Sequence, residues 1–169
     1  MAKQKCGAYR RGDTRPVRAY AMPGVDIKKD DFLVRDATLP HYVKPATGAI
    51  ADLGTNVSAF VGIALHGVKA TDEARHVEVA TTGDFQYKLK AADQVNVGDM
   101  LTIGDDGTNL VNQTLIVTTT AAEALFIAAS TTGHPDFDWS NPPANIAVAD
   151  LDSKDEVEAR ILLANGVMG

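Results

Sequence analysis

The stretch that most constrains the fold is residues 60–104, where apolar and polar residues alternate over several short runs. Alternation with a period of two places the apolar side chains on one face of a β-strand. It is seen at Val77 and Val79, and again along residues 85–89. Glycines recur near the ends of these runs, at positions 62, 67, 83, 98 and 104. Because glycine adopts positive φ without a Cβ clash, this pattern predicts a meander of short strands joined by tight turns.

Further strands are expected on both sides of this meander. Short apolar or alternating runs occupy residues 25–34, 57–65, 109–117, 146–148 and 157–163. The fold class that follows is mainly β, a small antiparallel β-barrel or β-sandwich. Residues 61–80 predict an apolar strand, an acidic turn and an alternating strand, and residues 145–163 weakly repeat this order. Either an internal repeat or two merely similar hairpins would explain the likeness.

Composition predicts a light core. Hydrophobic residues make up 45% of the 169, but aromatic residues only 6%, so Val, Ile, Leu and Ala must fill most of the interior. The single cysteine, Cys6, has no partner within the chain for a disulfide. A core of this kind benefits from association with a partner.

The charge of the chain is divided unevenly. Residues 1–24 carry six Lys or Arg against Asp13 alone, a charge of +5. Because the net charge of the whole chain is −6, the remaining residues carry −11. We expect two parts: an extended basic N-terminal arm, residues 1–24, and a β-rich domain, residues 25–169. The residues of the arm expected to contact a partner are Lys3, Lys5, Arg10, Arg11, Arg15, Arg18 and Tyr20.

The arm has more than one interpretation. Residues 14–22 alternate and could add as a strand to the sheet edge of another protein. A disordered tail is equally compatible with its composition. Because no Lys or Arg occurs between Lys90 and Lys154, we do not expect the body of the domain to bind nucleic acid. Binding of nucleic acid by the arm is a third hypothesis, for which affinity would fall steeply with salt.

We expect residues 131–145, which contain three prolines and the only tryptophan, to form a long loop. Phe137 and Trp139 alternate with aspartates there. These aromatic residues could anchor an interface, or they could fold back and plug one end of a light barrel.

The sequence predicts no catalytic, cofactor-binding or metal-binding residues, and we do not expect an enzyme. The four histidines are widely spaced and no HExxH arrangement is present. Neither GxSxG nor a glycine-rich phosphate loop occurs. The opening residues lack the apolar stretch of a secretory signal, and no run of about 18 apolar residues predicts a membrane span, so we expect synthesis in a cytoplasm and no membrane partner.

Several strands resemble those of the head decoration, or cement, proteins of tailed bacteriophages. The matching segments are Gly62-Ile63-Ala64, Val77-Glu78-Val79 with Gly83 and Phe85, Val95 to Leu101, and Val157 to Leu163. The resemblance covers residues 25–163. The leader and the section from 114 to 145 are longer than the family pattern requires, which leaves the docking site and oligomeric state open.

The resemblance implies a non-enzymatic virion protein on the outer surface of a phage capsid. Such a protein would bind the major capsid protein and neighbouring copies of itself, often as a trimer, and would stabilise the shell by bridging coat subunits. The alternative function is a host-surface or carbohydrate-binding β-module displayed on a virion, which would use the 131–145 loop.

Overall fold

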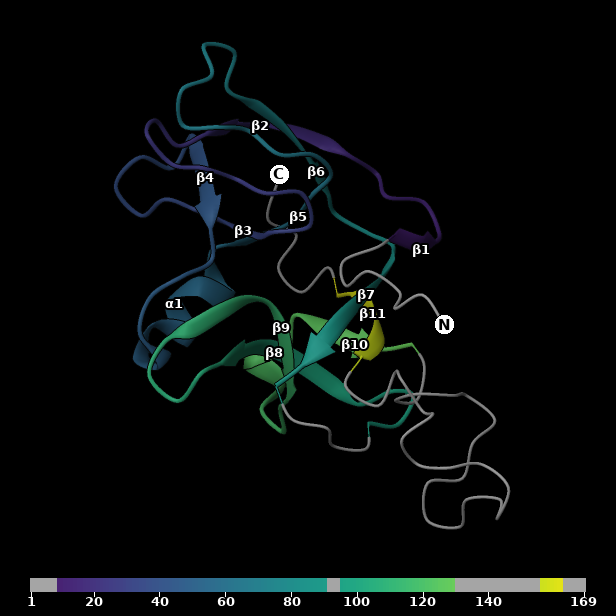
Figure 1. Cartoon of the computed structure of the whole chain (residues 1–169). Coiled ribbons are helices and arrows are strands. Elements are labelled where there is room, and N and C mark those ends of the chain that lie inside the picture. The colour runs from purple at the N-terminus through teal and green to yellow at the C-terminus, as the bar shows by residue number, and fades with distance from the viewer. Residues whose placement is uncertain (1–8, 91–94, 130–155, 163–169) are drawn as a thin grey trace, which may run out of the picture.

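The main secondary structure of the chain is β-strand, as the alternation predicts (Figure 1). The computed structural model describes residues 9–90, 95–129 and 156–162. In these residues the strands are three to eight residues long. The prediction of a mainly β fold that contains a barrel is confirmed.

Five strands of the first half close into a barrel in the order β2-β4-β3-β5-β6. Only β2 and β4 are parallel neighbours, and the other four pairs are antiparallel. Closure lets each strand pair on both sides within the chain. The strands of this first barrel are β2 (Val17–Ala21), β3 (Phe32–Arg35), β4 (Tyr42–Pro45), β5 (Phe60–Ala64) and β6 (His76–Ala80).

A second sheet closes on itself in the same way. Its order is β1-β7-β11-β10-β8-β9, and an additional parallel pairing of β7 with β9 completes a ring of five, which we call the second barrel. The short strand β1 (Tyr9–Arg11) lies outside this ring, on β7. The strands of the ring are β7 (Asp84–Leu89), β8 (Met100–Asp105), β9 (Leu110–Val117), β10 (Phe126–Ala128) and β11 (Glu156–Ile161).

The two barrels share one topology and one register. The strands β7 to β11 take the places of β2 to β6 in order, with the parallel pair in the same position. Tyr20 opposes Tyr42 in the parallel pair of the first barrel, and Lys88 opposes Thr114 in that of the second. The other four pairs of each ring give the same alignment of residues. The chain therefore contains the same fold twice.

A turn with matching hydrogen bonds precedes the second strand of each barrel. The Asp31 carboxylate accepts the amide of Lys28 at 2.8 Å, and the Asp99 carboxylate accepts the amide of Asn96 at 2.9 Å. The carbonyl of each aspartate then accepts the amide of the last residue of β5 or β10. Such local bonds fix where each strand begins.

The weak repeat expected from the sequence is confirmed in part. Glu78 of β6 and Glu158 of β11 occupy equivalent positions, since each opposes the matching residue of β2 or β7. The strand equivalent to β5 is β10, however, and not the expected run at 146–148, which lies outside the described residues.

Contrary to the prediction, residues 9–24 do not form an arm separate from the domain, and the boundary expected after residue 24 does not divide two units. β1 pairs with β7, and β2 lies between β4 and β6 in the first barrel. Ala19 and Ala21 are buried there, because small side chains fit the narrow interior. The alternation of residues 14–22 did mark a strand, but its partners belong to the same chain. Residues 1–8 lie outside the described residues.

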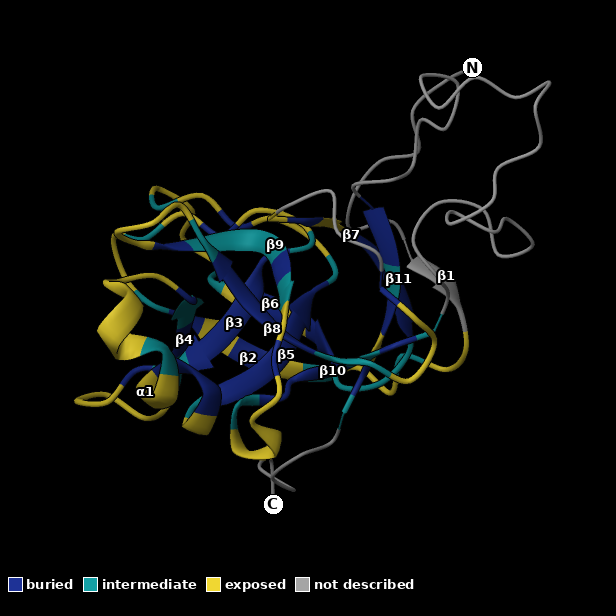
Figure 2. Cartoon of the chain, turned by 90° about the horizontal axis from the view of Figure 1, so that it is seen from below, coloured by how far each residue is buried: buried dark blue, intermediate teal, exposed yellow. Residues whose placement is uncertain are grey.

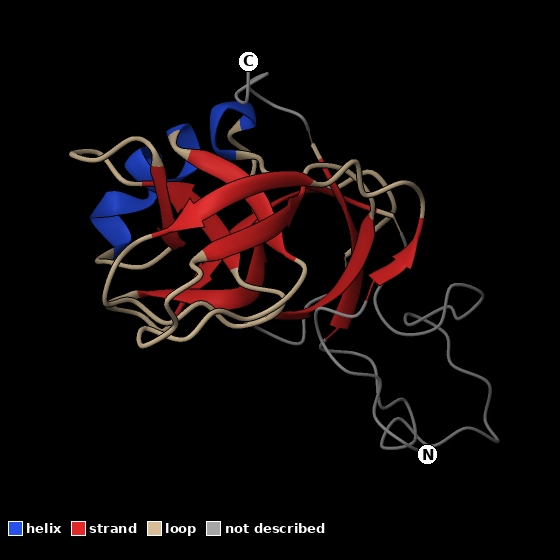
Figure 3. Ribbon diagram, turned by 90° about the horizontal axis from the view of Figure 1, so that it is seen from above, coloured by secondary structure: helices blue, strands red, loops and turns tan. Residues whose placement is uncertain are grey.

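The segment between β4 and β5 is helical rather than a loop. It contains the turn η1 (Ile50–Asp52) and the helix α1 (Leu53–Ser58), so the strand expected from residue 57 begins only at Phe60. The equivalent connection in the second barrel holds only the turn η2 (Ala121–Glu123). Figure 3 shows these helical segments on one side of the molecule, where α1 contacts η2.

Two apolar clusters fill the molecule, and both consist mainly of strand residues (Figure 2). The smaller cluster fills the first barrel with aliphatic residues and alanine. The larger one joins the second barrel to β3 and β5 of the first. Phe126 lies at its centre, with ring centroids 5.2 Å from Phe32, 5.7 Å from Phe60 and 6.1 Å from Tyr87. The two barrels therefore share one core.

Polar side chains of β9 also join the barrels. Asn112 accepts the amide of Phe32 at 2.8 Å, and it donates to the carbonyls of Phe32 and Ala46 at 3.0 and 3.1 Å. The next residue, Gln113, has positive φ (63°) and donates to the carbonyl of Lys29 and to the carboxylate of Asp31. These bonds replace the strand pairing that β3 would otherwise need at this point.

We expect Asn112→Ala to lower the free energy of unfolding by about 2 kcal/mol, because it leaves one amide and two carbonyls without these partners. Asn112→Asp should cost at least as much, since a carboxylate would face two carbonyls. Urea unfolding measures both changes. Asn96→Ala, in an exposed turn, serves as the control and should change stability by less than about 0.5 kcal/mol. Equal effects of Asn112→Ala and the control would contradict this account.

Candidate binding surface

An aromatic cluster lies on the outer face of the first barrel. Tyr20 of β2 is 54% exposed, and the register places it between Tyr42 of β4 and His76 of β6. The Tyr20 ring centroid lies 4.5 Å from that of His76 and 6.5 Å from that of Tyr42. We call these three residues the aromatic face. Tyrosine is enriched at binding interfaces because its ring offers a large contact area and its hydroxyl a hydrogen bond.

The second barrel shows that the fold does not need this cluster. The equivalent positions there hold Lys88, Thr114 and Glu156. The same ring of strands therefore forms with no aromatic residue at these three places. An exposed aromatic group that the architecture does not require is a candidate for binding.

Charged residues border the aromatic face. Arg18 and Glu78 are directly opposite each other on β2 and β6, one residue pair beyond Ala19, and both are exposed. Opposite charges at such a position contribute little to stability in water. They do limit the surfaces that can approach Tyr20, because a partner must match both signs.

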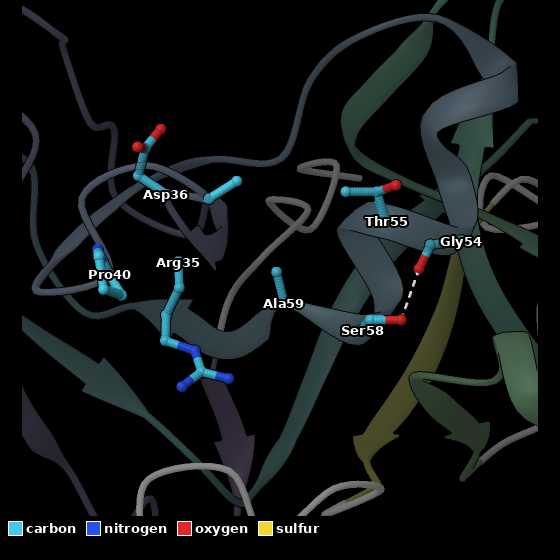
Figure 4. A pocket seen from close by; sticks show the side chains of 8 residues that line it. Arg35, Asp36, Pro40, Gly54, Thr55, Ser58 and Ala59 are labelled. Carbon is cyan, nitrogen blue, oxygen red and sulfur yellow. Dashed lines mark hydrogen bonds between the residues drawn. The ribbon is translucent and has the colours of Figure 1, made fainter.

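A groove lies between α1 and the end of β3. Its volume is about 560 Å³, and the wall consists of Arg35, Asp36, Ala37, Pro40, Gly54, Thr55, Ser58 and Ala59 (Figure 4). The Ser58 hydroxyl donates to the carbonyl of Gly54 at 2.8 Å, within the helix. In Figure 4 the Arg35 guanidinium and the Asp36 carboxylate point in opposite directions.

The Asp36 carboxylate is held by its own hairpin. One oxygen accepts from Lys44 at 2.7 Å, and the other accepts the amides of Thr38 and Leu39, both at 2.9 Å. The hydrogen bond from Lys44 and then those two amides lower the pKa of Asp36 from 3.8 to about 2. Asp36 therefore stays ionised and bound within the β3–β4 hairpin.

The structure places the residues predicted for the arm in different surroundings. Arg10 and Arg11 belong to β1. Arg15 lies 3.6 Å from Asp13 in an exposed pair. Arg18 and Tyr20 lie on β2, so only these two contribute to the candidate surface described above. Lys3 and Lys5, with Phe137 and Trp139 of the predicted loop, lie outside the described residues.

Sequence reasoning missed Tyr42, His76 and Arg35. The alternation around Tyr20 could have shown that its side chain points away from Ala19 and Ala21. No local signal, however, indicates that residues 42 and 76 flank it. That proximity depends on pairings between strands that are distant in sequence.

Within the described residues, no group of three His, Cys, Asp or Glu side chains could hold a metal ion. The same part of the chain contains no helix with the length and apolar character to cross a membrane. No protein-family model and no curated protein matches this sequence.

The lowered pKa of Asp36 makes a pH-dependent contribution to stability. A depressed pKa in the folded state stabilises the fold above the unfolded value, 3.8, and this contribution is lost as pH falls toward about 2. We expect Asp36→Asn to be less stable than the wild type at neutral pH, and the difference to shrink between about pH 4 and pH 2. Urea unfolding across this range measures it. A difference that does not change with pH would contradict the assignment.

Proposed function

We propose that this chain is a structural protein of a bacteriophage head, which binds the outer surface of the capsid and stabilises it by bridging neighbouring coat subunits. The observation that carries the proposal is the aromatic face, in which the exposed Tyr20 and His76 lie beside the half-buried Tyr42. The second barrel forms without aromatic residues at these positions. The resemblance of the strand and turn pattern to head decoration proteins supports the same function.

The architecture suits a protein that must resist deformation. The barrels share the cluster around Phe126, and Asn112 binds the backbone of the other barrel, so a load on one barrel is transmitted to the other. Closed rings also satisfy the strand edges internally, which limits pairing with other chains. Binding to the assembled shell in many copies would stabilise that shell by mass action.

The charges of the two halves suggest which barrel faces the coat. Residues 17–80 carry seven Lys or Arg and eight Asp or Glu, a balance of −1. The described residues of the second half, 84–90, 95–129 and 156–161, carry three and seven, a balance of −4. An acidic surface repels copies of itself and the phosphates of nucleic acid at long range. The nearly neutral first barrel, which has the aromatic face, is the better docking side.

The alternative function, a host-surface or carbohydrate-binding module, rests on the same exposed ring. An exposed tyrosine presents a flat apolar surface on which the face of a sugar could stack. Phe137 and Trp139, the residues predicted for that role, lie outside the described residues. Glycan binding by the variants distinguishes this alternative from capsid binding.

The test exchanges the aromatic face for the residues that the second barrel uses. In the triple variant Tyr20→Lys, Tyr42→Thr and His76→Glu, the fold should persist, because the same ring of strands accommodates these residues. Co-sedimentation with empty heads of the phage that carries this chain should fall by about 100-fold in affinity, as expected when a few central aromatic residues are lost.

Val97→Ala provides the control, since Val97 is 66% exposed and belongs to the second half of the chain. It should bind heads as the wild type does. Circular dichroism and thermal unfolding establish that the triple variant is folded. Wild-type affinity of a folded triple variant would refute the proposal. Loss of binding to an immobilised glycan array, with head binding unchanged, would favour the alternative.

A further inference from the structure

Arg35 occupies a position where the fold itself favours an apolar side chain. In the first barrel Arg35 opposes Val43, and in the second Ile103 opposes Leu115. Ile103 is 1% exposed and belongs to the shared core. The two barrels therefore differ at this equivalent position, where the first has a half-buried arginine that lines an open groove.

The guanidinium has no acidic partner among the described residues. The adjacent Asp36 carboxylate points away from it and is already bound by Lys44 and two amides. Arg160 provides a contrast, because its Nε donates to Asp84 at 2.7 Å and its Nη2 donates to the other oxygen at 3.0 Å. Arg35 thus offers the planar donor set that bidentate carboxylate binding uses, and no carboxylate of the described residues occupies it.

The groove itself depends on an insertion in the first barrel. Between β4 and β5 the chain adds α1, which supplies Thr55 and Ser58 to the wall opposite Arg35. The shorter connection of the second barrel has no α-helix. A volume of about 560 Å³ is ample for a carboxylate side chain with its methylene groups. The Ser58 hydroxyl already donates to the carbonyl of Gly54, so the guanidinium of Arg35 is the main donor available to such a ligand.

We propose that this groove receives an acidic side chain of the coat surface on which the aromatic face docks, and that Arg35 binds its carboxylate. The partner in this inference rests on the proposed function, whereas the carboxylate specificity does not. The two features are linked by the β3–β4 hairpin, which supplies Tyr42 to the aromatic face and Asp36 and Pro40 to the groove. The aromatic face and the groove are thus connected through one short segment of the chain. The aromatic residues supply contact area, and Arg35 sets the register through charge.

The chemistry is tested on the purified protein with acetate as the probe. The Nε–H resonance of Arg35 is followed by nitrogen–proton NMR as sodium acetate replaces sodium chloride at constant ionic strength. We expect a saturating shift for Arg35 alone. Arg160, which is already bound by Asp84, and the exposed Arg18 are internal controls. Their Nε–H resonances should shift only slightly and in proportion to the acetate concentration. A linear response of Arg35 no larger than that of Arg18 would overturn the inference.

The partner is tested with Arg35→Ile, which introduces the residue of the second barrel. Its thermal stability should equal or exceed that of the wild type, because an apolar residue suits this position. Its affinity for heads should fall about tenfold. Arg35→Lys keeps the charge but lacks the planar donor set, so its affinity for heads should fall as well. Because this variant changes the side chain least, it controls for loss of binding through misfolding.

The two proposals fail separately. If Arg35→Ile binds heads as the wild type does while the triple variant of the aromatic face does not, the groove inference is wrong and the proposed function stands. If neither variant affects head binding, neither the aromatic face nor Arg35 contacts the coat. A saturating shift with acetate would then support only the claim that Arg35 binds carboxylates.

Discussion

The structure depends on the packing of two small barrels against one another around Phe126. A single five-stranded ring with alanine at two interior positions of β2 buries little apolar surface, and small cores of that kind are marginal. The aromatic rings of Phe32, Phe60 and Tyr87 close around Phe126 and merge the interior of the second barrel with the outside of the first. Four of the ten aromatic residues in the chain are used in this way, because large rings contribute most where two curved sheets leave a wide gap.

The repeated topology makes one half of the molecule a control for the other. Positions that serve the fold keep their character in both barrels: Leu33 and Leu101 are fully buried, and Asp31 and Asp99 form the same turn. Positions that differ sharply point to a role outside folding. Two positions differ in this way: Tyr20 is replaced by Lys88 in the second barrel, and Arg35 by Ile103. Tyr20 and Arg35 both lie on strands of the first barrel.

Electrostatics and topology together assign different roles to the two barrels. The second half of the chain carries most of the negative charge. Local hydrogen bonds lower the pKa values of Asp105 and Asp106 and raise the pKa of Arg160, so all three groups stay charged. Residues 17–80 are close to neutral and carry the aromatic face and the half-buried Arg35. The proposed docking surface therefore lies on the less charged half of the chain.

The sequence by itself determined the strand-rich fold, the turns at its glycines and aspartates, and the alternation that turns Tyr20 outward, because these follow from local backbone preferences with a period of two. It also indicated weakly that β6 and β11 are related. It misplaced residues 9–24 as an arm, since nothing in a short basic strand identifies which sheet it joins. Only the tertiary structure decided that β2 completes the first barrel, that Asn112 caps β3, and that Tyr42 and His76 flank Tyr20. Those contacts join residues far apart in the chain, and ring closure, which no local pattern encodes, brings them together.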